Sequence, residues 1–135
     1  MKLESCNEIL EQANSLFDDK NFIEALRCAE EALICRNGTC PEATLLIGLA
    51  HQRLNNNERA VEFFKKTEYD AKQGEFLEAS FHKGVSLERL EKYREALEAW
   101  TKCETSTATD KHLLASYYKG ILFQEMGEYR EAISS

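Results

Sequence analysis

The sequence predicts an all-α protein built as a solenoid of antiparallel helix pairs. Apolar residues recur at helical spacing along most of the chain, and no stretch alternates apolar and polar side chains as a strand would. A small residue followed twelve positions later by Ala occurs four times, about 35 residues apart: Ala13/Ala25, Gly48/Ala60, Gly84/Ala96 and Gly120/Ala132. A fixed period in this range marks stacked units, each too small to bury its apolar face alone.

The clearest copy of the period is KGVSLERLEKYREALEAW, residues 83–100. Moving it back by 36 residues places Gly84 on Gly48 and Trp100 on Phe64. We expect the small residue to face the Ala of the next helix, so that the two backbones approach closely. Phe64 and Trp100 are then expected to fill the space toward the neighbouring hairpins.

Capping patterns delimit the first two helices. Ser5 with Glu8 forms a capping box, and Asn21 with Glu24 is its Asn analogue. The first two helices are therefore expected to begin at these residues, and the second is expected to reach about Cys35.

Turn residues separate the later helices. Pro41 suits the first turn of the third helix, where its missing N–H costs nothing. Residues 55–57, three asparagines, are expected to end that helix, and Gly74 is expected to end the fourth. The fifth helix is expected over about residues 75–90. The remaining boundaries are a bend at 91–92, a polar loop at 105–110, an N-cap at Asp110, a stop at Gly127 and an eighth helix from near Tyr129.

At these residues the chain resembles the tetratricopeptide repeat (TPR) family. In the third repeat the matching residues are Gly84, Leu87, Tyr93, Ala96, Trp100 and Cys103. The resemblance implies a right-handed superhelical solenoid of about 3.5 repeats. The repeats would cover residues 6–39, 41–74, 77–110 and, incompletely, 113–135, within one TPR-like domain over residues 1–135. Because the last helix is short and leaves apolar side chains uncovered, we expect a fragment of a longer chain, or self-association through the C-terminal end.

The resemblance also implies a function. Such arrays bind a peptide or helix of another protein in a concave groove lined by the first helix of each pair. The partner-binding residues would then be Asn14, Leu46, Leu49, Arg53, Phe81, His82, Val85, Arg89, Tyr117, Tyr118 and Ile121. We interpret the chain as a non-enzymatic adaptor or scaffold within a multiprotein complex.

One subset of the family holds the C-terminal carboxylate of cytosolic chaperones with Lys, Asn and Arg side chains. Of those positions this chain keeps Asn14. The others read Leu10, Leu46, Glu78 and His82. A carboxylate needs donors and positive charge, so the residues present argue against a co-chaperone role.

Charge and hydropathy narrow the classes of partner. The 135 residues carry a formal net charge of -7, and Lys and Arg form no cluster, which disfavours a nucleic-acid surface. A basic or apolar protein partner is expected instead. No apolar run approaches the roughly 18 residues that span a membrane, and the N-terminus lacks the apolar core of a signal peptide. We expect an intracellular protein, cytoplasmic rather than nuclear.

The five cysteines show no regular spacing. They are Cys6, Cys28, Cys35, Cys40 and Cys103, and reduced thiols are expected. Cys35 and Cys40 with His51 have the wrong spacing for a zinc site and lack a fourth ligand. No metal or cofactor is therefore expected. No catalytic residue is predicted either, because the sequence has no Ser-His-Asp arrangement, Gly-rich phosphate loop or HExxH pattern.

Two alternatives remain open at this point. An RNA-binding helical repeat of the pentatricopeptide type has a similar period, although the negative charge and the Gly/Ala–Ala packing disfavour it. The stack could also be purely structural and orient another domain. Residues 113–123, rich in aromatic and aliphatic side chains, fit a partner contact and internal packing equally well.

Overall fold

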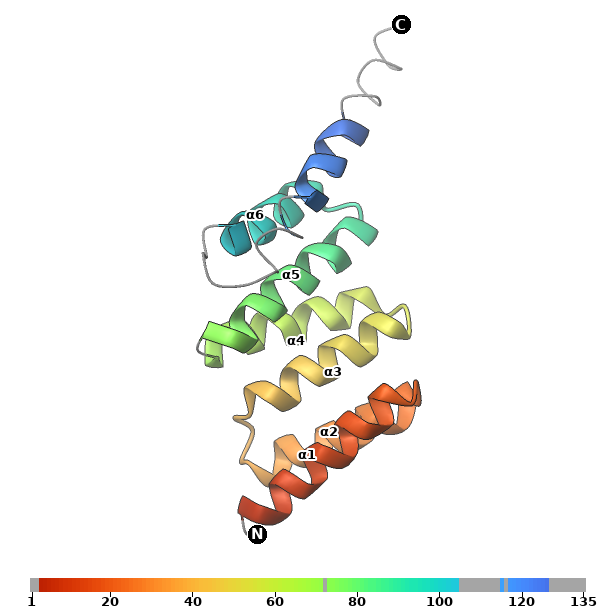
Figure 1. Ribbon diagram of the computed structural model, residues 1–135, viewed down its shortest axis with the longest axis vertical. Helices are drawn as coiled ribbons and strands as arrows, with labels where there is room; N and C mark the ends of the chain where they lie inside the picture. Colours follow the sequence, from red (N-terminus) through yellow and green to blue (C-terminus); the bar gives the residue numbers. More distant parts are fainter. Residues whose placement is uncertain (1–2, 72, 105–114, 116, 127–135) are drawn as a thin grey trace, which may run out of the picture.

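The computed structural model describes residues 3–71, 73–104, 115 and 117–126, and its helices form an elongated stack from the N-terminus to the C-terminus (Figure 1). The helices are α1 (Leu3–Asp18), α2 (Phe22–Cys35), α3 (Pro41–Arg53), α4 (Asn57–Asp70), α5 (Gln73–Arg89) and α6 (Tyr93–Glu104). A further helical segment covers residues 117–126. No strand occurs within the described residues. The predicted all-α solenoid is confirmed.

The helices pack as hairpins whose first members face one side. Within hairpins α1 packs on α2, α3 on α4 and α5 on α6, and between hairpins α2 contacts α3 and α4 contacts α5. The first helices also touch, because α3 contacts both α1 and α5. The backbones of the second helices, α2, α4 and α6, do not come close to one another. The stack therefore curves toward the first helices, which line its concave side.

The three hairpin turns repeat one backbone conformation. Lys20, Asn55 and Glu91 each have a positive φ, of 64°, 67° and 62°. The next residue in each turn donates a backbone hydrogen bond to the carbonyl oxygen five positions back; the pairs are Asn21 to Leu16 (2.9 Å), Asn56 to His51 (2.7 Å) and Lys92 to Leu87 (2.9 Å). This is the Schellman arrangement that satisfies the last carbonyls of a helix. The period of 35–36 residues is therefore present in the backbone as well as in the side chains.

The small residues on the first helices make room for aromatic rings rather than for Ala. A Cβ added to Gly48 would lie 2.6 Å from Cε1 of Phe64, and one added to Gly84 would lie 2.6 Å from Cδ1 of Trp100. Both rings are fully buried. Each ring packs against the glycine of its own hairpin and also contacts the next hairpin, where Phe64 stacks on His82 and Trp100 stacks on Tyr118. The expectation that Phe64 and Trp100 fill the space toward neighbouring hairpins is therefore confirmed.

Some predicted boundaries are correct and others shift. Pro41 begins α3, and Glu91 lies in the turn before α6. Ser5 lies inside α1, so the predicted capping box does not begin that helix. Gly74 lies in the first turn of α5, because α4 already ends at Asp70. Asn21 is the N-cap of α2 but makes no side-chain capping bond. The predicted loop at 105–110, Asp110, Gly127 and the eighth helix lie outside the described residues.

The expectation of five reduced thiols is wrong. Cys6 at the start of α1 and Cys35 at the end of α2 form a disulfide, with their Cα atoms 5.6 Å apart. The antiparallel hairpin brings these two ends together, although 29 residues separate them in sequence. Because of this bond, Cys35 is not available as a metal ligand together with Cys40 and His51. Cys28, Cys40 and Cys103 are buried outside the disulfide.

A buried charged cluster joins α4 to α5. The Glu68 carboxylate accepts hydrogen bonds from Ser80 Oγ and Lys83 Nζ. Lys83 is 7% exposed, so most of its charge is removed from water and depends on Glu68. Lys102 Nζ on α6 lies 3.9 Å from the same carboxylate. Such a pair fixes how two hairpins meet, because removing one partner would leave the other charge buried and unpaired.

Candidate functional site: the concave groove

A cavity of about 530 Å³ lies on the concave side, between the first helices of successive hairpins. Its lining comes from the end of α3, the turn after it, α5 and the segment 117–126. The lining residues are Gln52, Arg53, Asn55, Phe81, His82, Val85, Arg89 and Tyr118. We call this cavity the groove. Six of the eleven partner-binding residues predicted from the sequence lie here: Arg53, Phe81, His82, Val85, Arg89 and Tyr118.

The floor of the groove is built from buried side chains. Phe81 is 4% exposed, and its ring packs edge-on against Tyr118 at 5.5 Å and against His82 at 5.1 Å between centroids. Tyr118 also stacks on Trp100 at 5.7 Å. The position of Tyr118 is therefore fixed by the ring that fills the space over Gly84, and the repeat architecture sets the shape of the groove.

Gln52 holds the two hairpins together beneath the groove. It is 5% exposed, and its Nε2 donates to the His82 carbonyl oxygen at 2.9 Å and to Ser86 Oγ at 2.8 Å. These bonds tie α3 to α5 where the cavity opens. The sequence analysis did not name Gln52 or Asn55. The sequence indicates only weakly that these two residues belong to the site. Gln52 precedes Arg53, and Asn at position 55 is a residue type that tolerates the positive φ of the turn.

Two arginines supply the full positive charges of the groove lining. Arg53 and Arg89 are both exposed, and neither forms an ion pair among the described residues. The Arg53 guanidinium lies 5.8 Å from the centre of the Phe17 ring of α1, which positions it over the first hairpin. Beside Arg89, burial and the charge of Glu125 raise the pKa of Glu88, and Arg89 opposes this shift. Among the described residues, no carboxylate lines the groove itself.

His82 and Val85 lie between the buried floor and the rim. Both are half-buried, and Val85 packs against the cluster that contains Phe81 and Trp100. His82 Nε2 lies 3.8 Å from a carboxylate oxygen of Glu78, one turn earlier on α5. The groove thus combines an apolar floor with a polar and cationic rim.

The other five predicted residues do not line this cavity. Leu46 is absent from the lining of the cavity and belongs to the core of the first two hairpins, so we no longer assign it to a partner. Leu49 is half-buried against the cluster of Ala60 and Phe64. Asn14 is exposed on α1 and donates to the Leu10 carbonyl oxygen at 3.1 Å. Tyr117 is 66% exposed and Ile121 is half-buried, both on the last described helical segment.

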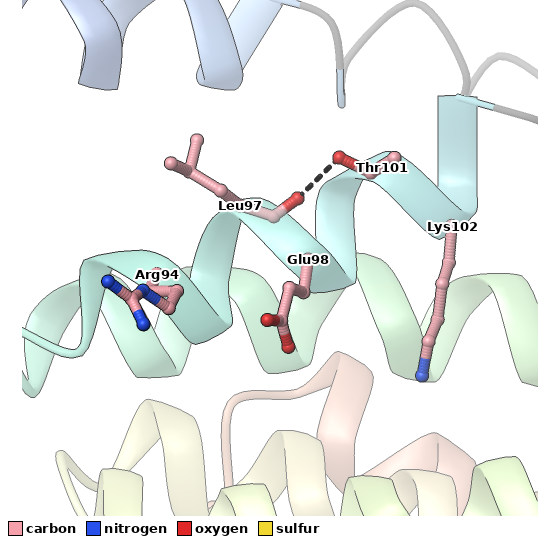
Figure 2. Close-up of a pocket in the computed structure, with 5 residues that line it drawn as sticks. All are labelled: Arg94, Leu97, Glu98, Thr101 and Lys102. Carbon is pink, nitrogen blue, oxygen red and sulfur yellow. Dashed lines mark hydrogen bonds between the residues drawn. The ribbon is translucent and has the colours of Figure 1, made fainter.

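A second hollow of about 420 Å³ lies along α6 (Figure 2). Its lining residues, Arg94, Leu97, Glu98, Thr101 and Lys102, all come from that one helix. Thr101 Oγ1 donates to the Leu97 carbonyl oxygen at 2.7 Å and accepts from Lys119 Nζ at 3.2 Å. The hollow mixes charges of both signs, and Leu97 is the aliphatic side chain among its lining residues. It offers less for recognition than the groove, whose walls come from three helical segments.

Within the described residues, no three His, Cys, Asp or Glu side chains gather as a metal site. Burial raises the pKa of the Cys28 and Cys40 thiols, which keeps both protonated and weakly nucleophilic. No helix in the described part of the chain is long and apolar enough to cross a membrane.

The fold and groove define a helical-repeat solenoid with a groove on its concave side. The family model for the tetratricopeptide repeat matches residues 41–66, which cover α3 and most of α4. The match lies within one hairpin of the stack and supports the likeness to the tetratricopeptide repeat family that the sequence predicted. No curated protein sequence matches the chain significantly.

Two solved structures with the same fold are similar over most of their length. The translocator chaperone SycD of the type III secretion system of Yersinia enterocolitica superposes with a TM-score of 0.85 at 9% identity, covering 94% of this chain and 89% of that one. The TPR domain of Sgt2 from Aspergillus fumigatus superposes with a TM-score of 0.78 at 15% identity, covering 94% and 82%. At these identities the likeness shows the fold alone.

Proposed function

We propose that the protein is a non-enzymatic adaptor that binds a segment of a partner protein in the groove and holds it within a larger complex, inside the cell. The observation that carries the proposal is the groove itself. An apolar floor of fixed rings, a hydrogen-bonded base and an open polar rim are the features of a surface that recognises a peptide.

The energetics favour a short segment over a small molecule. The rim is open and spans three helical segments, so a ligand needs length to contact Arg53, Val85 and Arg89 together. Apolar side chains of the segment would be buried against Phe81 and Val85, at roughly 25 cal/mol per Å² of apolar surface. Since Gln52 and Tyr118 are already held by internal contacts, little ordering of the groove is needed on binding.

A second mode of association is supported by side chains of the segment 117–126. Tyr117 is 66% exposed and Phe123 is 55% exposed. These rings are suited to docking a following helix, another domain or a second copy. Sedimentation over a range of concentrations tests the second copy: self-association that Phe123→Ser abolishes would support it, and a monomer at every concentration would exclude it.

Site-specific photo-crosslinking tests the adaptor proposal. A photoreactive amino acid replaces Arg89 at the groove or Tyr69 on α4, which is 91% exposed. We expect adducts with a defined partner from position 89 and not from position 69. The same partner should be lost when Val85→Asp is added, with helicity unchanged by circular dichroism. Val85 is preferred to Leu49 as the site of this change, because Val85 lines the groove and Leu49 does not. Adducts from position 69 alone would contradict the proposal.

A further inference from the structure

We propose that the segment bound in the groove is acidic: a peptide of another protein that presents Asp or Glu carboxylates to Arg53 and Arg89 beside apolar side chains that meet Phe81 and Val85. This inference rests on the proposed function of the groove, and it specifies the chemistry of the partner.

The argument begins with a contrast between the chain and the groove. The chain has 24 acidic and 17 basic residues, which by itself favours a basic partner. The described lining of the groove has the opposite local charge, since its fully charged residues are Arg53 and Arg89 and it includes no carboxylate. Surface charges farther away than about 8–10 Å are largely screened at physiological salt, so a ligand in the groove responds mainly to the local pair.

The two arginines are available for an external anion. Some cations on the described surface pair with a neighbouring acid, as Arg27 does with Glu24 and Arg59 with Glu62. Arg53 and Arg89 are exposed and have no such ion pair among the described residues. Arg53 is instead held over the Phe17 ring, which leaves its N–H groups directed to other acceptors. An arginine offers five N–H donors in a planar fork that matches a carboxylate.

The arrangement of Arg53 and Arg89 differs from the set of Lys, Asn and Arg side chains with which one subset of the family holds a chaperone's C-terminal carboxylate. Arg53 and Arg89 follow Leu46 and His82 by seven residues on α3 and α5, which is about 10 Å along a helix axis. Leu46 is buried in the core and offers nothing to a carboxylate. The positive charge therefore lies two turns farther along the first helices. At this location, acidic side chains in the middle of a partner segment meet the rim while apolar side chains of the same segment meet the floor.

The experiment uses three immobilised libraries of peptides about twelve residues long, a length that spans a groove of this kind. Every peptide has Leu, Ile or Phe at four positions. The remaining positions are Asp and Glu in the first library, Asn and Gln in the second, and Lys and Arg in the third. We expect the full chain to bind the acidic library best, and raising the salt from about 0.05 M to about 0.5 M should weaken that binding.

A charge-reversed variant and a matched control locate the interaction. Arg53→Glu with Arg89→Glu should lower affinity for the acidic peptides by about tenfold or more, because two attractive contacts become repulsive. Arg59→Glu with Lys65→Glu on α4 changes the net charge equally and should leave the affinity within about twofold. Thermal melts verify that each variant is folded, and the salt dependence of the wild type gives an answer even if a variant is not.

The outcomes separate the two proposals. If the amide or basic peptides bind as well as the acidic ones and Val85→Asp abolishes binding, the groove binds peptides but the acidic preference is wrong. If no library binds, or Val85→Asp has no effect on binding, both proposals fail. If the chain alone dimerises and the charge-reversed variant does not, the occupant is a second copy of the chain and a separate acidic partner is excluded.

Discussion

The indole of Trp100 lies where a side chain on Gly84 would have to be. Its Cδ1 is 2.6 Å from the position of an added Cβ, and its Nε1 donates to the Phe81 carbonyl oxygen at 3.1 Å. The same ring stacks on Tyr118 at the groove. One small residue on α5 therefore sets both the packing of the third hairpin and the wall of the groove.

Gly84→Ala should destabilise the fold by about 1–3 kcal/mol, because the hydrogen-bonded indole has little room to move away. Gly74→Ala is the matched control on the same helix. An added Cβ there meets nothing within 4 Å, so this change should stabilise the protein by about 0.4–1 kcal/mol. Urea unfolding of both variants measures the difference. Equal stabilities would show that the close approach of Gly84 and Trp100 is absent.

Breaking the Cys6–Cys35 disulfide should cost about 3–4 kcal/mol, since the bond closes a loop across 29 residues and restricts the unfolded chain. The measurement is unfolding with and without reductant. Cys6→Ala with Cys35→Ala should have the stability of the reduced protein and no response to reductant. Alkylation of the denatured, unreduced chain should modify three thiols. Modification of all five would contradict the bond.

Glu68→Gln should destabilise the protein by about 3–5 kcal/mol, because it leaves the Lys83 ammonium buried without an anion. Glu62→Gln provides the comparison. Its pair with Arg59, at 3.7 Å, joins side chains that are 65% and 57% exposed, so the loss should stay below about 0.5 kcal/mol. A similar small loss for both variants in thermal unfolding would mean that the cluster between α4 and α5 contributes little.

His51 should make the fold sensitive to mild acid. Burial, followed by the charge of Arg59, lowers the pKa of His51 from its usual 6.5, while Glu30 and Glu62 act in the opposite direction. The folded state therefore binds fewer protons than the unfolded state between the lowered pKa and about 6.5. The contribution of neutral His51 to the free energy of unfolding is complete above that pH range and declines as the pH falls through it.

The test of this prediction compares wild type with His51→Gln. The melting temperature of wild type should fall more between pH 7.5 and pH 5.5, about one unit to either side of an ordinary histidine, than that of the variant. Other titrating groups are common to both proteins and cancel in the difference. Equal pH dependence of the two proteins would show that His51 does not carry the effect.

The period of small residues was sufficient to predict the stacked hairpins, because packing at Gly48 and Gly84 requires a particular residue size. The shared conformation of the turns was harder to predict from the sequence. Lys20, Asn55 and Glu91 share a backbone conformation but no residue type, so only the structure reveals that they correspond. The disulfide was missed for a related reason: Cys6 and Cys35 meet only after the hairpin has formed.

For the site, the sequence identified the concave side but could not separate its lining from its core. Helical spacing places Leu46 and Arg53 on the same helix, yet only tertiary packing buries Leu46 and leaves Arg53 exposed. Gln52 was missed because its role depends on Ser86 and the His82 carbonyl oxygen of the next hairpin. Net charge led to the prediction of a basic or apolar partner, because an average over the chain does not show the local charge of the groove.

Amide NMR of the isotope-labelled chain, titrated with the tightest peptide of the acidic library, tests the central claim most directly. Binding in the groove predicts chemical-shift changes at Arg53, Val85 and Arg89, with little change at Ile34 and Tyr69, which are exposed on the second helices. Changes centred on Ile34 and Tyr69, with Val85 and Arg89 unaffected, would contradict the account and place the binding surface on the convex side.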